Sequence, residues 1–277
     1  MTLGLPTAAR RTIVNLISDA SMRRGRRGQE KTMTGRLQGK VAIVTGGSRG
    51  QGASHVRAFI KEGAKVAFTD VRVELGQELA AELGENALFI QHDVSNPQDW
   101  ERVVAETEAA FGPVSVLVNN AGIVLLKEIA DLTFEEYSKV IAVNQNSVFL
   151  GMKSVLPSMR RAGVGSIVNV SSAAVYRGVK GNSAYTAAKI AIHGLSRVAA
   201  LEFAEENIRV NTVLPGIIQT PMVDEPDPER VAEINSRIPV KRLADPQEVS
   251  NMIVYLASDE ASYTTAAEIT VDGGITA

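Results

Sequence analysis

The sequence predicts an α/β protein with one doubly wound parallel sheet and helices on both of its faces. Two observations lead to this prediction. From Lys40 onward, short apolar runs alternate with helical stretches, and no internal repeat or low-complexity linker interrupts the alternation. Strands that are covered on both faces are continuous in Val, Ile, Leu and Ala. The strand, helix, strand order at this spacing implies right-handed crossovers between parallel strands.

Seven apolar runs are expected to be strands, over residues 41–45, 65–70, 87–91, 114–118, 166–171, 208–213 and 268–271. Helices are expected between them, near residues 52–62, 73–83, 97–111, 133–161, 183–206 and 246–257. A chain of 277 residues is long enough to bury one large core. We therefore predict that residues 35–277 form a single domain.

Residues 1–34 have a different composition, with four arginines between positions 23 and 27 and no period that would bury a face. We interpret them as a basic, flexible tail. The tail is either a dispensable extension, since a second methionine stands at Met33, or a targeting or lipid-contacting arm.

The charge is distributed unevenly along the chain. The first 40 residues carry nine basic and two acidic residues, a sum of +7, and the whole chain sums to −2, so residues 41–277 sum to −9. An acidic domain lacks the basic surface that nucleic acid requires, and we expect no nucleic-acid partner. No apolar run approaches 18 residues and no secretory signal is recognisable, which predicts a cytoplasmic protein without a membrane span.

The residue types also limit the chemistry. The chain has no cysteine, so a disulfide, a thiolate metal site and a cysteine nucleophile are all excluded. The histidines are His55, His92 and His193, and their spacing is not that of a zinc site. We expect them to be structural and predict no metal.

A glycine-rich turn follows the first expected strand. Gly46, Gly50 and Gly52 have the spacing G-x-x-x-G-x-G, which differs from the G-x-G-x-x-G of longer Rossmann-type enzymes. Where a buried strand runs through such a turn into a helix, backbone N–H groups can approach a pyrophosphate at the positive helix end. The turn indicates a Rossmann-type nucleotide site, although a tight structural turn would also explain the glycines.

Asp70 strengthens the nucleotide interpretation, because it ends the second strand about 20 residues after the turn. A carboxylate there can accept hydrogen bonds from the adenosine ribose and would repel a 2′-phosphate, which favours NAD over NADP. Arg49 in the turn points weakly the other way, since it could pair with a 2′-phosphate. We give more weight to Asp70, because Arg49 can turn to solvent.

Tyr185 and Lys189 are four residues apart at the start of an expected helix, so both project from one face. A tyrosine can exchange a proton with a substrate oxygen only if its pKa, about 10 when free, is brought toward neutrality. A lysine one helical turn away is a sufficient perturber at an effective dielectric constant of about 20. Taken alone, however, Y-x-x-x-K also arises by chance on surface helices.

The order of the motifs along the chain resembles that of the short-chain dehydrogenases/reductases, over essentially all of residues 37–277. The resemblance rests on the glycine-rich turn, Asp93-Val94, Asn119-Asn120-Ala121-Gly122, Asn144, Ser171-Ser172, Tyr185-Thr186-Ala187-Ala188-Lys189, Pro215-Gly216 with Thr220, and Val271-Asp272-Gly273-Gly274. Ser172 stands thirteen residues before Tyr185, the separation that the family shows.

The resemblance implies a role for each matching residue. Tyr185 would be the general acid/base, Lys189 would lower its pKa and hold the nicotinamide ribose, Ser172 would bind the substrate oxygen, and Asn144 would hold a water in a proton relay. NAD would be bound by Gly46, Arg49, Gly50, Gln51, Gly52, Asp70, Asp93, Val94, Asn120, Ala121, Gly122, Tyr185, Lys189, Ile218 and Thr220. Two features depart from the family: Gln51 replaces a usually apolar residue, and the basic tail has no counterpart.

The implied reaction is hydride transfer between a secondary alcohol or ketone and the nicotinamide. Residues 50–57, 248–260 and 271–274 are similar to bacterial 3α(20β)-hydroxysteroid dehydrogenases, so an apolar alicyclic or steroid-like substrate is expected. The alternatives are a 3-oxoacyl-thioester reductase, against which Asp70 and the acidic domain count, and a non-catalytic nucleotide sensor. The resemblance also implies a homo-oligomer, usually a tetramer, formed through the helices near 133–161 and 183–206.

The substrate is expected beyond the carboxyl ends of the strands, as in other open α/β sheets. We predict an apolar pocket between the strand that ends near Ser172 and residues 217–239. Tyr176, Val179, Ile217 and Met222 are the candidates for its wall, chosen by position and apolarity.

Overall fold

The computed structural model describes residues 35–222 and 227–277. Its strands are β1 (Val41–Thr45), β2 (Lys65–Asp70), β3 (Ala87–Gln91), β4 (Val116–Asn119), β5 (Gly165–Val170), β6 (Ile208–Pro215) and β7 (Glu268–Val271). They form one sheet in the order β3-β2-β1-β4-β5-β6-β7, and every neighbouring pair is parallel. The strand order reverses between β1 and β4, and nucleotides bind at such a switch point in open α/β sheets.

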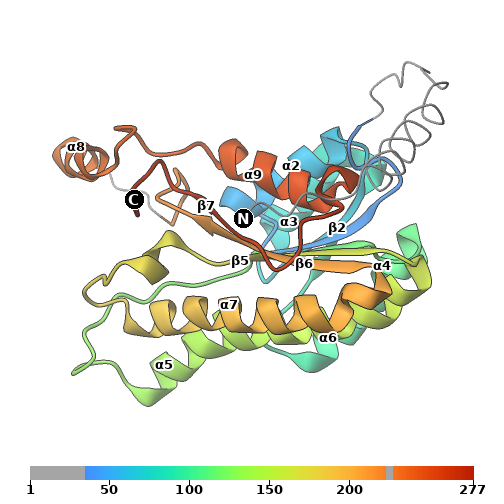
Figure 1. The fold of residues 1–277 in the computed structure, drawn as a ribbon, viewed down its shortest axis with the longest axis horizontal. Helices are drawn as coiled ribbons and strands as arrows, with labels where there is room; N and C mark the ends of the chain where they lie inside the picture. The colour runs from blue at the N-terminus through green and yellow to red at the C-terminus, as the bar shows by residue number, and fades with distance from the viewer. Residues whose placement is uncertain (1–34, 223–226) are drawn as a thin grey trace, which may run out of the picture. The chain divides into compact units, whose positions relative to one another are not determined.

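Helices cover both faces of the sheet, as predicted (Figure 1). One face carries α2 (Gly50–Lys61), α3 (Val73–Leu83) and α9 (Pro246–Ala257), and the other carries α4 (Pro97–Phe111), α5 (Phe134–Ile141), α6 (Ser147–Ala162) and α7 (Ser183–Phe203). A further helix, α8 (Pro228–Arg237), lies away from the sheet in the segment after β6. The fold is therefore the doubly wound, Rossmann-type α/β architecture.

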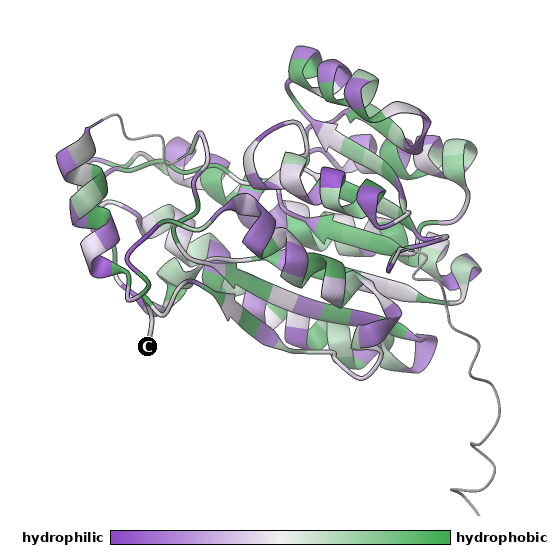
Figure 2. Cartoon of the chain, turned by 90° about the horizontal axis from the view of Figure 1, so that it is seen from above, coloured by the Kyte–Doolittle hydropathy of each residue, from purple (hydrophilic) through white to green (hydrophobic). Residues whose placement is uncertain are grey.

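The apolar core has two layers, one on each side of the sheet. One layer packs α2, α3 and α9 on the sheet and includes Phe59, Phe68 and Ile253, and the other packs α4, α6 and α7 and includes Trp100 and Ile192. Green is prominent in the strands of Figure 2, because more than half of their residues are apolar. This pattern explains why the strands were recognisable as continuous apolar runs.

The predicted helix over residues 133–161 is wrong as a single element. It consists of α5, a π-helical turn at Ala142–Asn146 and α6. The side chain of Asn144 within this turn bonds to the backbone of Ile123 in a distant loop. Hydrophobic periodicity cannot reveal such a turn, because a tertiary contact is satisfied there rather than a local preference.

Three smaller differences concern element boundaries. β4 begins two residues later than predicted, β5 ends one residue earlier at Val170, and β6 continues to Pro215. The helix α8 was not predicted, although Asp227 caps it and Pro228 occupies its first turn, a recognised start signal. Gly35–Ala277 form one compact unit, while the proposed tail, residues 1–34, lies outside the described residues.

Candidate active site

The glycine-rich turn connects β1 to α2 and needs glycine at several positions. Gly46 and Gly50 have φ angles of 64° and 57°, in the left-handed region that favours glycine. A Cβ atom at Gly52 would lie 1.9 Å from the carbonyl oxygen of Gly46. The backbone therefore stays open at the start of α2, where an anionic group is favoured.

Unpaired polar atoms in the same turn fit a bound nucleotide. The Oγ atom of Ser48 and the Oε1 atom of Gln51 are buried and have no hydrogen-bond partner among the described residues. Buried polar atoms normally have partners, so these two indicate a ligand with polar groups. Gln51 thus supplies a polar group where the family usually has an apolar one.

Asp70 lies at the end of β2 and faces the glycine turn. Its side chain is 5% exposed, and its carboxylate accepts a hydrogen bond from the backbone N–H of Ser48 at 3.4 Å. It also pairs with Arg72, from the backbone N–H at 3.1 Å and from the guanidinium at 3.2 Å. Arg49, in the turn itself, is exposed. The carboxylate of Asp70 therefore lies against the glycine turn and is paired with Arg72.

The segment after β4 is fastened to the glycine turn. The side-chain amide of Asn120 donates to the carbonyl oxygens of Thr45 and Gly46 at 2.9 and 3.2 Å. The backbone N–H groups of Asn120 and Ala121 both donate to Oγ1 of Thr45 at 3.0 Å. These bonds place Asn120, Ala121 and Gly122 beside the turn, as the sequence predicted for a shared nucleotide site.

Asp93 and Val94 follow β3 at the same edge. The carboxylate of Asp93 accepts hydrogen bonds from the backbone N–H and hydroxyl of Ser95 at 2.9 and 2.6 Å. Val94 is buried, and its carbonyl oxygen accepts a hydrogen bond from Nε1 of Trp100 at 2.9 Å. Trp100 was not among the predicted site residues, although its hydrogen bond helps to hold Val94 in place.

The loop after β6 reaches the glycine turn from the other side. Ile218 is buried and pairs with Ala244 in a single β-bridge. The Oγ1 atom of Thr220 donates to the carbonyl oxygen of Ile218 at 3.4 Å. A Cβ atom at Gly50 would lie 3.5 Å from the Cβ of Thr220. Ile218 and Thr220 thus flank the part of the turn that opens α2.

Tyr185 and Lys189 come from the first two turns of α7 and face the carboxyl end of β5. The Nζ atom of Lys189 lies 5.7 Å from the centre of the Tyr185 ring and donates to the carbonyl oxygen of Val170 at 2.8 Å. Ser172 follows β5, and its side chain shares a hydrogen bond with Tyr185. The structure therefore brings these three predicted residues together.

Asn144 is fully buried and joins the same group through Gly122. Its amide donates to the carbonyl oxygens of Ile123 and Val140, both at 2.9 Å, and its Oδ1 accepts from the N–H of Ile123 at 3.1 Å. A Cβ atom at Gly122 would lie 2.6 Å from Oδ1 of Asn144 and 3.5 Å from Nζ of Lys189. The π-helical turn thus holds its side chain against the loop that follows β4.

The pKa of Tyr185 is shifted in the direction opposite to the one we expected from Lys189. Burial raises the pKa of Tyr185, and the hydrogen bond with Ser172 lowers it by less. Burial lowers the pKa of Lys189 to about 8. We predicted that Lys189 lowers the pKa of Tyr185, but the protein groups by themselves raise it, because the loss of water disfavours the phenolate.

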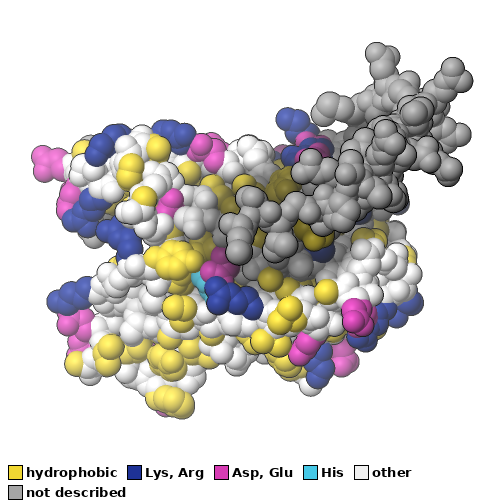
Figure 3. Space-filling view, viewed as in Figure 1, with side chains coloured by type: hydrophobic (Ala, Val, Ile, Leu, Met, Phe, Trp, Pro, Cys, Tyr) yellow, Lys and Arg dark blue, Asp and Glu magenta, His cyan; other side chains and the backbone are white. Residues whose placement is uncertain are grey.

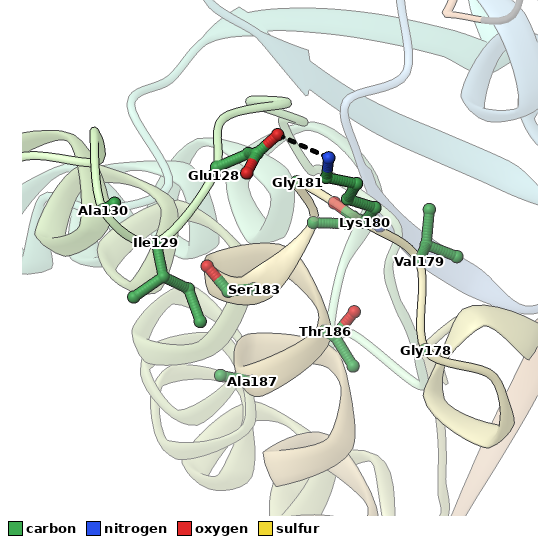
Figure 4. A pocket seen from close by; sticks show the side chains of 11 residues that line it. Glu128, Ile129, Ala130, Gly178, Val179, Lys180, Gly181, Ser183, Thr186 and Ala187 are labelled. Atoms are coloured by element: carbon green, nitrogen blue, oxygen red, sulfur yellow. Dashed lines mark ion pairs between the residues drawn. The ribbon is translucent and has the colours of Figure 1, made fainter.

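The residues predicted to line a substrate pocket do not share one cavity. Val179 lines a cavity of about 520 Å³ between the loop at Glu128–Ala130 and the start of α7, with the ion pair of Glu128 and Lys180 at its mouth (Figure 4). Ile217 lines a separate cavity of about 130 Å³. Tyr176 instead bonds to Glu268 on β7, and Met222 is exposed.

The described residues, 35–222 and 227–277, contain no cluster of three or more His, Asp or Glu side chains that could hold a metal ion. No helix in this part of the chain is both long and apolar enough to cross a membrane. His55 and His92 are buried in the core, and burial lowers their pKa values to about 3 and about 4.

Fold and site together define a nicotinamide-dependent oxidoreductase: a glycine-rich nucleotide turn lies beside a Ser, Tyr and Lys group at one edge of a doubly wound sheet. A family model described as enoyl-(acyl carrier protein) reductase matches residues 46–276. The chain belongs to the short-chain dehydrogenase/reductase family, and it is an NAD(P)-dependent oxidoreductase that acts on CH–OH groups.

The curated relatives have named activities on secondary alcohols. A 3-alpha-(or 20-beta)-hydroxysteroid dehydrogenase of Mycobacterium tuberculosis is 47% identical over 245 residues, which are 88% of this chain and 92% of the relative. An NADP-dependent (R)-specific alcohol dehydrogenase of Lentilactobacillus kefiri is 42% identical, with coverage of 88% and 100%. A cyclopentanol dehydrogenase of Comamonas sp. is 40% identical, with coverage of 88% and 99%.

Proposed function

We propose that this protein is an NAD-dependent dehydrogenase that transfers a hydride between the nicotinamide and an apolar alicyclic or steroid-like secondary alcohol or ketone. The observation that supports it best is the convergence of Ser172, Tyr185 and Lys189 beside the glycine turn. A carboxylate at Asp70 favours an unphosphorylated adenosine ribose. The test is a screen for NADH formation over steroid, alicyclic and 3-hydroxyacyl alcohols.

The nicotinamide supplies the hydride acceptor, and the protein residues manage the proton. Tyr185 removes the hydroxyl proton of the alcohol as the hydride leaves, and returns it in the reverse direction. Ser172 holds the same oxygen by a hydrogen bond. Lys189 stabilises the phenolate of Tyr185 by its charge and holds the nicotinamide ribose. Asn144 orders the water through which the proton leaves.

An apolar substrate is supported by exposed apolar side chains near the site. Leu126 is 68% exposed, Val179 49% and Met222 54%, and they come from three loops that follow β4, β5 and β6. Ligands in open α/β sheets bind beyond the carboxyl ends of the strands, so exposed apolar side chains in these loops favour an apolar substrate. The hydroxysteroid and cyclopentanol substrates in the names of the relatives agree with this class. Turnover of a 3-hydroxyacyl thioester but of no alicyclic alcohol would contradict it.

The proposal includes a cytoplasmic homo-oligomer, with a tetramer as the expected form. Exposed apolar side chains follow α7, where Ile190, Val198 and Leu201 are 52%, 55% and 79% exposed, and Phe134 of the neighbouring helix α5 is 77% exposed. Apolar side chains are visible over these helices in Figure 3. Sedimentation of wild type and of Leu201→Glu tests this assembly, which should weaken in the variant.

A further inference from the structure

A polar cluster with no role in the reaction described above joins the catalytic helix to the edge strand of the sheet. Its centre is His193, which lies one helical turn after Lys189 on α7 and is 8% exposed. The Nε2 atom of His193 lies 2.9 Å from Oγ of Ser171, and its Nδ1 atom lies 2.9 Å from Oε2 of Glu268. The imidazole therefore bridges the end of β5 and the start of β7.

Ser171 contacts both His193 and the proposed catalytic lysine, Lys189. Its hydroxyl lies 3.0 Å from the main-chain oxygen of Lys189, while Nζ of Lys189 reaches the carbonyl oxygen of Val170 at 2.8 Å. Two consecutive residues thus contact the same lysine: Val170 binds its ammonium group, and Ser171 binds its main-chain oxygen. Ser172, the next residue, is the proposed substrate ligand.

Glu268 also binds two further side chains of the cluster. Arg197, one turn further along α7, pairs with its Oε1 at 2.8 Å, and the hydroxyl of Tyr176 donates to its Oε2 at 3.2 Å. Tyr176 lies in the short helical turn that follows Ser172. The carboxylate therefore binds both the turn that follows Ser172, through Tyr176, and the catalytic helix α7.

We propose that His193 is a positioning residue for the dehydrogenase reaction: through its bond to Ser171, it sets the position of Tyr185 and Lys189 relative to Ser172. This inference rests on the proposed roles of those three residues. A displacement of about 1 Å in such a group can slow turnover about 100-fold. His193 touches neither substrate nor nucleotide in this arrangement and acts through Ser171.

The donors and acceptors of the cluster fix how it is connected. A carboxylate only accepts hydrogen bonds, so Nδ1 of His193 donates to Glu268. The hydroxyl of Ser171 lies within hydrogen-bond distance of both the carbonyl oxygen of Lys189 and Nε2 of His193.

Three side chains surround the imidazole in the described structure: Glu268 from β7, Arg197 from α7 and Tyr176 from the turn after β5. They hold the ring between the sheet edge and the catalytic helix.

The test compares substitutions that keep one arm of the link between Ser171 and Glu268. Gln at position 193 places an amide nitrogen near the position of Nε2 and can still donate to Ser171, whereas Asn places one near Nδ1 and reaches only Glu268. We expect His193→Asn and Ser171→Ala to lower kcat at least tenfold, within the range that misplacement of a catalytic group produces. His193→Gln should stay within about threefold of wild type at neutral pH. If Ser171→Ala and His193→Asn both keep wild-type kcat, His193 does not position the catalytic group.

Rescue by the conservative variant separates positioning from a merely structural role, because His193→Gln and His193→Asn both remove the ring and differ in the arm of the link that they keep. Equal kcat values of these two variants would contradict the proposal. Glu202→Gln, at an exposed position of α7, is the matched control and should behave as wild type. If wild type forms no NADH from any alcohol, the proposed function fails instead.

Discussion

The ammonium group of Lys189 lies 2.8 Å from the carbonyl oxygen of Val170, two residues before Ser172. This contact ties the proposed catalytic lysine to the strand end that carries the proposed substrate ligand. Burial lowers the pKa of Lys189 to about 8, so the side chain is still mostly charged at pH 7. Its charge is therefore available to Tyr185 and to a nicotinamide ribose at neutral pH.

Replacing Tyr185 by Phe should lower kcat at least about 100-fold, the usual minimum for loss of a general acid/base. NADH affinity, measured by fluorescence titration, should change little, because the lost hydroxyl acts on the substrate oxygen. Lys189→Ala should reduce both kcat and NADH affinity, since it removes the charge beside Tyr185 and the ribose ligand. If Tyr185→Phe kept more than a tenth of wild-type kcat, another group would be handling the proton.

Wild type should prefer NAD over NADP, and Asp70→Ala should reverse much of that preference. The substitution removes a carboxylate and releases Arg72, whose guanidinium lies 3.2 Å from Asp70 and can then pair with a 2′-phosphate. We expect the NADPH to NADH ratio of kcat/KM to rise at least tenfold, equivalent to about 1.4 kcal/mol. The double variant Asp70→Ala, Arg72→Ala should lose most of this gain. A wild-type protein that prefers NADPH would contradict the assignment.

Gly122→Ala should impair both turnover and NADH binding. The added Cβ atom would lie 2.6 Å from Oδ1 of Asn144, so the side chain that holds Ile123 must move, and Nζ of Lys189 lies 3.5 Å away. Gly178→Ala is the matched control, because no atom lies within 4 Å of its added Cβ atom. We expect a kcat loss of at least tenfold at position 122 and none at 178, by steady-state kinetics. Equal behaviour of the two variants would argue against close packing around Asn144.

Stability should fall below pH 6.5 because of two buried histidines. Burial lowers the pKa of His55 to about 3 and that of His92 to about 4, so the unfolded chain binds more protons than the folded one between these values and about 6.5. Stability is thus fully present above pH 6.5 and declines as pH falls. Each histidine should remove about 1.4 kcal/mol of the free energy of unfolding between pH 7.5 and 5.5.

Urea unfolding at these two pH values measures the effect. The double variant His55→Gln, His92→Gln carries no titrating group at either position, so its loss between pH 7.5 and 5.5 should be about 3 kcal/mol smaller. An unchanged pH dependence in this variant would show that other groups govern acid unfolding.

Deletion of residues 1–32 should leave the melting temperature and kcat nearly unchanged. The composition of this segment offers no face that could be buried, and the compact unit Gly35–Ala277 does not include it. Thermal unfolding and NADH formation by the truncated and the full-length protein provide the comparison. Loss of folding or of activity would show that the segment is part of the domain.

The sequence by itself determined the architecture and the class of reaction. Parallel strands covered on both faces are rich in apolar residues, so β1, β2, β3 and β7 were predicted to the residue. The order of a glycine turn, a strand-end serine and Y-x-x-x-K indicated the family before any contact was known. These signals lie in local residue order, which the chain carries without help from tertiary packing.

Only the tertiary structure decided how the side chains pair. The π-helical turn at Asn144 exists because its side chain bonds to Ile123, 21 residues earlier, and no local pattern encodes that contact. The pKa of Tyr185 is raised where the spacing of Lys189 suggested a lowered one, because burial depends on every element around α7. The link from Ser171 through His193 to Glu268 likewise joins residues up to 97 positions apart. Such contacts arise only when the sheet order brings distant strand ends to one edge.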